Sequence, residues 1–368
     1  MTTQAPSRSG AVVSGWQGLV ARHQRWLALL VALGFLLIAS SYLYRGGFYG
    51  QLVTQMLIFA IAAMGVGFLG GYGGMVSLGQ ASFLGLGAYG VAVPMADGAG
   101  PWTAIAISLV VTLAVALLTG LLAVRVKGIS FVIMTLALGQ ILFGLASSWV
   151  DLSGGDNGLI IPVAPQLGPL DLNDPIVLSF TVLVIFVLAV LALRTFVASC
   201  FGLALRGIKS NEQRLKTLGY ATRLHLYISW VISVMFAGVA GILFVFTNGL
   251  ITPTALDFGH NGIVTLMAVI GGLGTLWGPT VGAIVIMLFQ NYLSLYFERW
   301  ATVMGIVFVA VVIFAPEGLW GLVTKLVRRL THQKAKRGQL GINAVPVGDA
   351  TAATDSELPD PTAEKVQQ

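Results

Sequence analysis

Charged side chains are scarce in this sequence. They make up 9% of its 368 residues, where a soluble domain carries about 25%. Hydrophobic residues account for 57%, and the mean hydropathy is +0.89. A chain with so few charges could not cover a water-exposed surface. The composition excludes a soluble enzyme, a disulfide-rich secreted domain and a disordered chain, and it predicts an all-α protein with several membrane-spanning helices.

Groups that carry out covalent or metal chemistry are also few. The single cysteine, Cys200, cannot form an internal disulfide, and the four histidines are scattered without ligand spacing. No G-x-x-x-x-G-K-[ST] loop occurs, so the chain should not hydrolyse nucleotide itself. One G-x-G-x-x-G, from Gly85 to Gly90, lies inside an apolar run, where it indicates helix packing. We expect no catalytic residue, no cofactor and no metal on this chain.

Ionisable side chains are missing from the middle of the apolar runs. Ion-coupled transporters usually keep such residues at membrane depth. Here the nearest one, Arg194, is close enough to a helix end for its guanidinium to reach the interface. A proton relay is therefore disfavoured. Backbone carbonyls at Gly-rich breaks could still bind Na⁺, so a stand-alone ion-coupled secondary transporter stays open as an alternative.

Ten apolar runs divide the chain after a polar N-terminal tail at 1–25. The runs cover 26–44, 52–70, 78–96, 102–124, 129–150, 176–197, 225–248, 261–273, 280–297 and 301–322. The first run is too long for a signal-peptide core, and glycines with Pro279 predict a tight turn between the eighth and ninth. We expect a transmembrane domain over 26–323 and a tail at 324–368 that is first basic and then disordered.

The distribution of basic residues predicts the orientation. Arginines before residue 26 place the N-terminus in the cytoplasm, and ten crossings then place the C-terminal basic cluster there too. Arg125, Lys127 and the basic residues between 206 and 223 fall on the same side. Only Arg45 and Arg299 fall outside, either to dock an acidic soluble partner or to anchor the chain at the membrane interface. The net charge of +6 therefore reflects topology and does not indicate nucleic-acid binding.

Two Gly-rich segments interrupt the apolar runs. The first, 70–83, has four glycines in five positions before Ser77, Gln80 and Ser82. The second, 270–279, contains Gly271, Gly272, Gly274 and Thr275. Near its end begins a Gly278–Gly282 spacing, which favours close helix contact. Irregular backbone at membrane depth is tolerated when it lines a wet cavity or is buried in protein. Both a pathway-lining turn and a tightly packed loop therefore stay open.

The longest charged internal loop covers residues 202–219. Leu205, Ile208, Leu215 and Leu218 predict short helices with one apolar face, and Gly219 is a suitable stop for the last of them. A simple connection would need only a few residues. Such a unit could dock another protein or lie on anionic lipid.

Four elements in this order resemble those of the permeases of ATP-driven branched-chain amino-acid importers, of the LivM type. The family's S-L-G-[QH]-[AS]-x-F-x-G-x-G-A-Y matches Ser77–Tyr89, and R-[AG]-I-[RK]-x-N-E matches Arg206–Glu212. G-G-L-G-[ST]-x-x-G-P matches Gly271–Pro279, and a closing P-x-G-L-x-G-L matches Pro316–Leu322. The resemblance covers about residues 50–323. It departs from the family after Glu212, where Arg214 and Leu215 replace small residues.

The resemblance implies an ABC importer permease fold of ten helices in two inverted halves, in a bacterial inner membrane. It implies a coupling loop at 202–219, with Arg206, Lys209, Asn211, Glu212 and Gly219, seated on a separate ATPase. The implied partners are two ATPases that bind ATP and Mg, a second homologous permease and a periplasmic binding protein. The pathway candidates are Ser77, Gln80, Ser82, Tyr89, Gly271, Gly272, Gly274 and Thr275. Branched-chain or related amino acids are the expected substrates, with urea or short amides as the alternative.

Overall fold

The computed structural model describes residues 48–161, 166–167 and 170–296, with short pieces at 302–303, 305–306, 309 and 318–321. Both predicted tails, the predicted run at 26–44 and most of the run at 301–322 lie outside the described residues. Arg45 and Arg299 also lie outside them.

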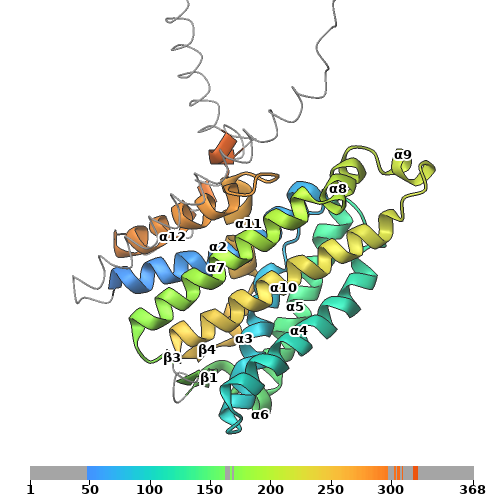
Figure 1. Ribbon diagram of the computed structural model, residues 1–368. Helices are drawn as coiled ribbons and strands as arrows, with labels where there is room; N and C mark the ends of the chain where they lie inside the picture. Colours follow the sequence, from blue (N-terminus) through green and yellow to red (C-terminus); the bar gives the residue numbers. More distant parts are fainter. Residues whose placement is uncertain are drawn as a thin grey trace, which may run out of the picture. The chain divides into compact units, whose positions relative to one another are not determined.

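Eight apolar helices dominate the described part of the chain (Figure 1). They are α2 (Phe48–Tyr72), α3 (Gln80–Ala96), α4 (Pro101–Ala123), α5 (Ile129–Ser148), α7 (Pro175–Ala198), α10 (Thr222–Asn248), α11 (Phe258–Gly271) and α12 (Gly278–Tyr296). Each corresponds to one of the predicted runs. Among the described residues, six of them are long and apolar enough to cross a membrane. The predicted break between the eighth and ninth runs is confirmed, because α11 ends at Gly271 and α12 begins at Gly278.

Short elements connect the helices at the two ends of the bundle. At one end lie α6 (Val150–Ser153), η1 (Gly155–Asn157), η2 (Pro253–Leu256) and two small antiparallel ladders. In the first ladder, β1 (Leu159–Ile160) pairs with β4 (Leu250–Ile251); in the second, β2 (Gln166–Leu167) pairs with β3 (Leu170–Asp171). At the opposite end lie α8 (Cys200–Ser210) and α9 (Glu212–Thr217), as Figure 1 shows.

The core lies around α2 and α10, because most side chains of α2 are buried by its neighbours. Trp230 of α10 is fully buried, and its ring meets Phe83 of α3 and Phe131 of α5 edge-on, with centroids 5.6 and 5.7 Å away. Its Nε1 donates a hydrogen bond to Thr119 Oγ1 of α4 at 3.1 Å. One aromatic side chain therefore joins four helices through packing and a satisfied polar group.

Glycines in α3 allow the helix backbones to approach closely. A side chain at Gly87 would collide with the backbone of Gly238 in α10, and one at Gly90 would press on Ser108 of α4. The interpretation of the motif between Gly85 and Gly90 as helix packing is therefore confirmed.

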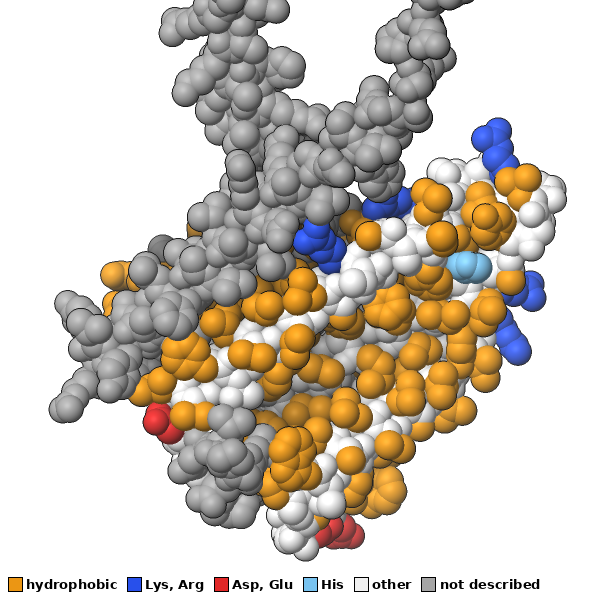
Figure 2. Space-filling view, viewed as in Figure 1, with side chains coloured by type: hydrophobic (Ala, Val, Ile, Leu, Met, Phe, Trp, Pro, Cys, Tyr) orange, Lys and Arg blue, Asp and Glu red, His pale blue; other side chains and the backbone are white. Residues whose placement is uncertain are grey.

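The surface divides into an apolar band and two charged ends. Large hydrophobic side chains such as Val110, Leu118, Ile133 and Ile141 are exposed on α4 and α5. Figure 2 shows hydrophobic side chains between one end with Lys and Arg, where α8 and α9 lie, and an opposite end with Asp or Glu. Such a surface is suited to a lipid bilayer, and the chain is a multi-pass membrane protein.

Candidate functional site

The predicted coupling loop forms two short helices, α8 and α9, that project from one end of the bundle (Figure 1). The expected apolar face is present on α8, where Leu205 and Ile208 are buried. It does not continue through α9, since Leu215 is half-buried and Leu218 is 69% exposed. Because α9 ends at Thr217, Leu218 belongs to the following turn and lies outside the packed face.

Local hydrogen bonds fix both ends of α9. At its start, the Asn211 side chain accepts a hydrogen bond from the Arg214 N–H at 3.0 Å, as an N-cap residue does. At its end, Gly219 has a φ of +83°, and its N–H donates to the Lys216 carbonyl at 3.0 Å. The Tyr220 N–H donates to the Leu215 carbonyl at 3.1 Å, which completes a Schellman motif. The predicted stop at Gly219 is confirmed.

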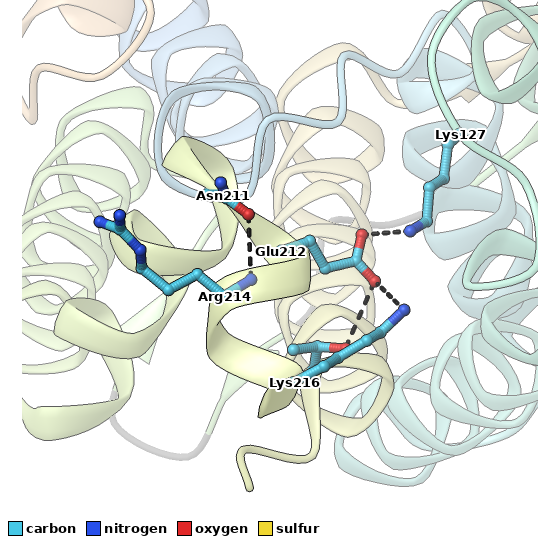
Figure 3. Close-up of polar contacts among 6 residues, drawn as sticks. Lys127, Asn211, Glu212, Arg214 and Lys216 are labelled. Carbon is cyan, nitrogen blue, oxygen red and sulfur yellow. Dashed lines mark hydrogen bonds and ion pairs between the residues drawn. The ribbon is translucent and has the colours of Figure 1, made fainter. Parts of the chain in front are cut away.

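Glu212 connects α9 to two other parts of the chain (Figure 3). Its carboxylate pairs with Lys127, in the connection after α4, and with Lys216, 2.8 Å away. It also accepts a hydrogen bond from the Thr222 hydroxyl at the start of α10, at 3.3 Å. Burial raises the pKa of Glu212, but the hydrogen bonds and charges of both lysines outweigh it and hold the pKa below its ordinary value. Sequence reasoning missed Lys127, because its contact with Glu212 spans 85 residues.

Two basic side chains of α8 reach the first Gly-rich segment. Lys209 Nζ donates a hydrogen bond to the carbonyl of Gly71 at 2.8 Å. The Arg206 guanidinium lies over the ring of Tyr72, 5.0 Å from its centroid, in a cation–π arrangement. The unit formed by α8 and α9 therefore contacts the end of α2, which leads into the Gly-rich turn before Ser77.

The second Gly-rich segment packs against the first. A side chain at Gly71 would collide with the backbone of Gly274, so these two turns are in direct contact. Thr275 Oγ1 donates to the Gly272 carbonyl at 3.1 Å and accepts from the Gly278 N–H at 3.0 Å, which begins α12. The three segments singled out in the sequence are therefore neighbours at one end of the bundle.

Close contact between α11 and α12 follows the predicted glycine spacing. A side chain at Gly282 would collide with the Met267 carbonyl, and one at Gly271 with the Gly278 carbonyl. Such contacts are possible only between backbones that lack side chains at these positions.

The polar residues after the first Gly-rich turn form a buried network. Ser77, Gln80 and Ser82 are all 0% exposed. Gln80 Nε2 donates to the Ser233 carbonyl and hydroxyl oxygens on α10, at 2.7 and 2.9 Å. The Ser233 hydroxyl in turn donates to the Gly65 carbonyl on α2 at 2.8 Å. This half of the network joins α3, α10 and α2.

The other half of the network joins α3 to α11. The Ser82 N–H donates to Asn261 Oδ1 at 3.0 Å, and Asn261 Nδ2 donates to Ser82 Oγ at 2.7 Å. The Thr265 hydroxyl donates to the Ser77 carbonyl at 2.9 Å. Sequence reasoning missed Ser233, Asn261 and Thr265. Each of them is a neutral polar side chain within an apolar run of the sequence. That pattern marks the residue but does not reveal its hydrogen-bond partner, which depends on the fold.

Two pathway candidates retain unused hydrogen-bonding groups. Within the described residues, neither Gln80 Oε1 nor the Tyr89 hydroxyl has a hydrogen-bond partner. The side chains of the network are enclosed in this conformation, so they line no open passage, and their role in a pathway stays a prediction. In the same part of the chain, no three His, Cys, Asp or Glu side chains gather as metal ligands would.

Comparison with known proteins identifies relatives over most of the chain. Residues 48–315 match the family model for the branched-chain amino acid transport system / permease component. The high-affinity branched-chain amino acid transport system permease protein LivM of Escherichia coli K12 is 26% identical over 314 residues, which cover 79% of this chain and 74% of that protein. LivM of Salmonella typhimurium has the same identity and coverage over 315 residues.

A probable branched-chain amino acid transport permease protein LivH from Methanocaldococcus jannaschii is 29% identical over 141 residues, which cover 35% of this chain and 44% of that protein. No solved structure matches the chain. The family match covers the helices, the α8–α9 unit and both Gly-rich segments described above. The chain therefore belongs to the branched-chain amino-acid ABC transport permease family.

Proposed function

We propose that this chain is the transmembrane permease subunit of an ATP-driven importer of branched-chain or related amino acids. The observation that carries the proposal is the α8–α9 unit, which projects from the bundle and contacts Gly71 and Tyr72 at the end of α2 through Lys209 and Arg206. A separate ATPase could bind this projecting unit and displace it relative to the membrane helices. The chain itself does no covalent chemistry, and ATP and Mg belong to the partner subunits.

The contacts suggest how a push on α8 and α9 would reach the membrane helices. Lys209 and Arg206 would pass a displacement to Gly71 and Tyr72, and the turn would pass it to the start of α3. There Gln80 and its neighbours are hydrogen-bonded to α10 and α11. Separation of α3 from these helices would expose the same neutral polar groups to a passing solute, as alternating access requires.

The proposed assembly contains a second homologous permease, two ATPase subunits and a periplasmic binding protein. One permease supplies half of a pore in a two-fold assembly. In the bacterial inner membrane, this chain would cross ten times in two inverted halves, with both termini in the cytoplasm. The α8–α9 end would then face the ATPases, and the end with β1 and β4 would face the binding protein.

Energised uptake of labelled leucine tests this function. Cells that express the chain with the products of its neighbouring genes should accumulate leucine. Arsenate, which depletes ATP, should abolish uptake, while a protonophore under conditions that preserve ATP should leave most of it. Uptake lost with the protonophore but retained with arsenate would support the ion-coupled alternative. Accumulation of urea without leucine would support the amide alternative.

A further inference from the structure

A cavity of about 320 Å³ lies between α2, α10, α11 and α12. It is at the end of the bundle away from α8 and α9, since Gln55 lies early in α2 and Asn248 is the last residue of α10. Its volume is at the lower end of the range of about 300–1,000 Å³ found for small-molecule sites. The cavity is distinct from the buried network at Gln80, and sequence reasoning did not find it.

The residues that line the cavity are arranged in two layers. Each helix places a polar residue near the end of the bundle and an apolar residue about one turn deeper, on the same helix face. The pairs are Gln55 and Phe59 on α2, Asn248 and Phe244 on α10, and Asn291 and Met287 on α12. On α11, His260 and Ile263 follow the same order. The outer half of the cavity is therefore polar and the inner half apolar.

Amide groups in the outer half have hydrogen-bonding capacity to spare. Gln55 Nε2 donates to Asn248 Oδ1 at 3.2 Å, and Asn291 Nδ2 donates to the Met287 carbonyl at 2.9 Å. Within the described part of the chain, the Gln290 amide has no hydrogen-bond partner. Among the described lining residues there is no Asp, Glu, Lys or Arg.

We propose that this cavity binds one zwitterionic amino acid with an apolar side chain, on the assumption that the proposed transport function holds. Side-chain amides offer both donors and acceptors, which suit a carboxylate and an ammonium together. The apolar inner half would hold the aliphatic side chain. An amino acid with a further charge would bring an unpaired charge into that half. Urea has no aliphatic side chain and would leave the apolar inner half empty.

Thiol protection tests the proposal on the purified full-length chain, without partner proteins or ATP. In a Cys200→Ser background, Ser294→Cys places a thiol on an exposed residue that lines the cavity. Leucine at saturation should slow its reaction with a maleimide at least fivefold, while glutamate, lysine and urea should not. The matched control is Ser148→Cys, an exposed serine at the end of α5, whose reaction should be unchanged.

A second variant tests the amide layer. Gln290→Leu, in the Ser294→Cys chain, should raise the half-protecting leucine concentration about tenfold through the loss of hydrogen bonds. Gln140→Leu, the same exchange on α5 away from the cavity, should leave it unchanged. A leucine-induced rise in melting temperature of the unmodified chain, abolished by Gln290→Leu, gives an independent readout.

The outcomes separate the cavity from the transport function. An unchanged labelling rate in leucine, or equal protection by glutamate or lysine, would overturn the proposed cavity even if ATP-driven leucine uptake is observed. Leucine protection in a chain whose assembled complex shows no ATP-driven uptake would support the cavity and refute the transport function.

Discussion

Glu212 shows how one side chain can fix a projecting unit. Its two lysine partners and the Thr222 hydroxyl come from three different parts of the chain. The Lys127 side chain is 59% exposed, so its pair with Glu212 is screened and contributes at most about 1 kcal/mol to stability. The geometric effect matters more, because these contacts hold α9 against the start of α10 and the connection after α4.

Glu212→Gln should destabilise the chain only above the pKa of Glu212. Because the folded-state pKa is lowered, the stabilisation is complete above the ordinary value of about 4.3. It disappears as the pH falls through the lower folded-state value. We expect the melting temperature to fall by about 1–2 °C at pH 7 and by less at pH 3, where Glu212 contributes less to stability.

Asp151→Asn, which removes a charge from an exposed side chain at the opposite end, should have no effect at either pH. Equal destabilisation by Glu212→Gln at both pH values would contradict the charge-pair account.

At the scale of elements, close backbone contacts join the helices near the Gly-rich turns. The contacts of Gly71 with Gly274 and of Gly282 with Met267 are between backbones. A helix pair in a membrane gains its stability largely from such packing, since lipid is as apolar as the side chains. The turns are therefore part of a packed unit that could move together.

Gly282→Ala and Gly144→Ala should change stability in opposite directions. Both glycines are inside helices, but a methyl group at Gly282 would collide with backbone, whereas at Gly144 nothing lies within 4 Å. The first change should destabilise by about 1–3 kcal/mol through overpacking. The second should stabilise by about 0.5–1 kcal/mol through lower backbone entropy of the unfolded chain. Melting temperatures in one detergent measure both, and a loss of stability in both variants would contradict the packing account.

Lys209→Met tests the contact between α8 and the end of α2. The substitution keeps the apolar stem but removes the donor to the Gly71 carbonyl. We expect the assembled complex to lose at least threefold in uptake while its ATP hydrolysis persists. The control is Arg214→Met, which removes the same charge from α9 at a side chain directed away from Glu212 in Figure 3. A similar loss in both variants would indicate a general charge effect.

The sequence was sufficient to predict elements that depend on local chemistry. Apolar length predicted the eight helices, Gly271 to Pro279 predicted the turn between α11 and α12, and Gly219 predicted the end of α9. Contacts between distant segments could not be predicted in this way. The pairing of Lys127 with Glu212 and of Ser82 with Asn261 depends on which helices are neighbours, and one sequence does not state this.

At the scale of the whole molecule, the two ends of the bundle differ in charge, with Lys and Arg at the α8–α9 end and Asp or Glu at the opposite end. The Lys127–Glu212 pair shows that the connection after α4 and the α8–α9 unit are at the same end. The basic residues of both segments were predicted to share one side of the membrane, and they lie at one end of the bundle, as that prediction requires. Which side faces the cytoplasm remains the prediction of the basic-residue distribution.

Cysteine labelling in intact cells tests this orientation. In a Cys200→Ser background, an impermeant maleimide should label Ser148→Cys, at the end of α5, from outside. It should reach Ser210→Cys, at the end of α8, only after the membrane is permeabilised. Lys334→Cys in the C-terminal basic cluster should behave like Ser210→Cys. Labelling of Lys334→Cys from outside would contradict the ten-crossing topology.

Coupling between the α8–α9 unit and a partner ATPase is the central claim. Its most direct test is uptake per ATP hydrolysed by the reconstituted complex with Glu212→Lys and Gly219→Val together. The control is Gly98→Val, because Gly98 has the same φ of +83° as Gly219 but lies at the opposite end of the bundle. A side chain at either glycine should cost about 1–2 kcal/mol.

The account predicts that the double variant stays folded and hydrolyses ATP with uptake reduced at least tenfold, while Gly98→Val keeps normal uptake per ATP. Normal uptake per ATP in the double variant would contradict it.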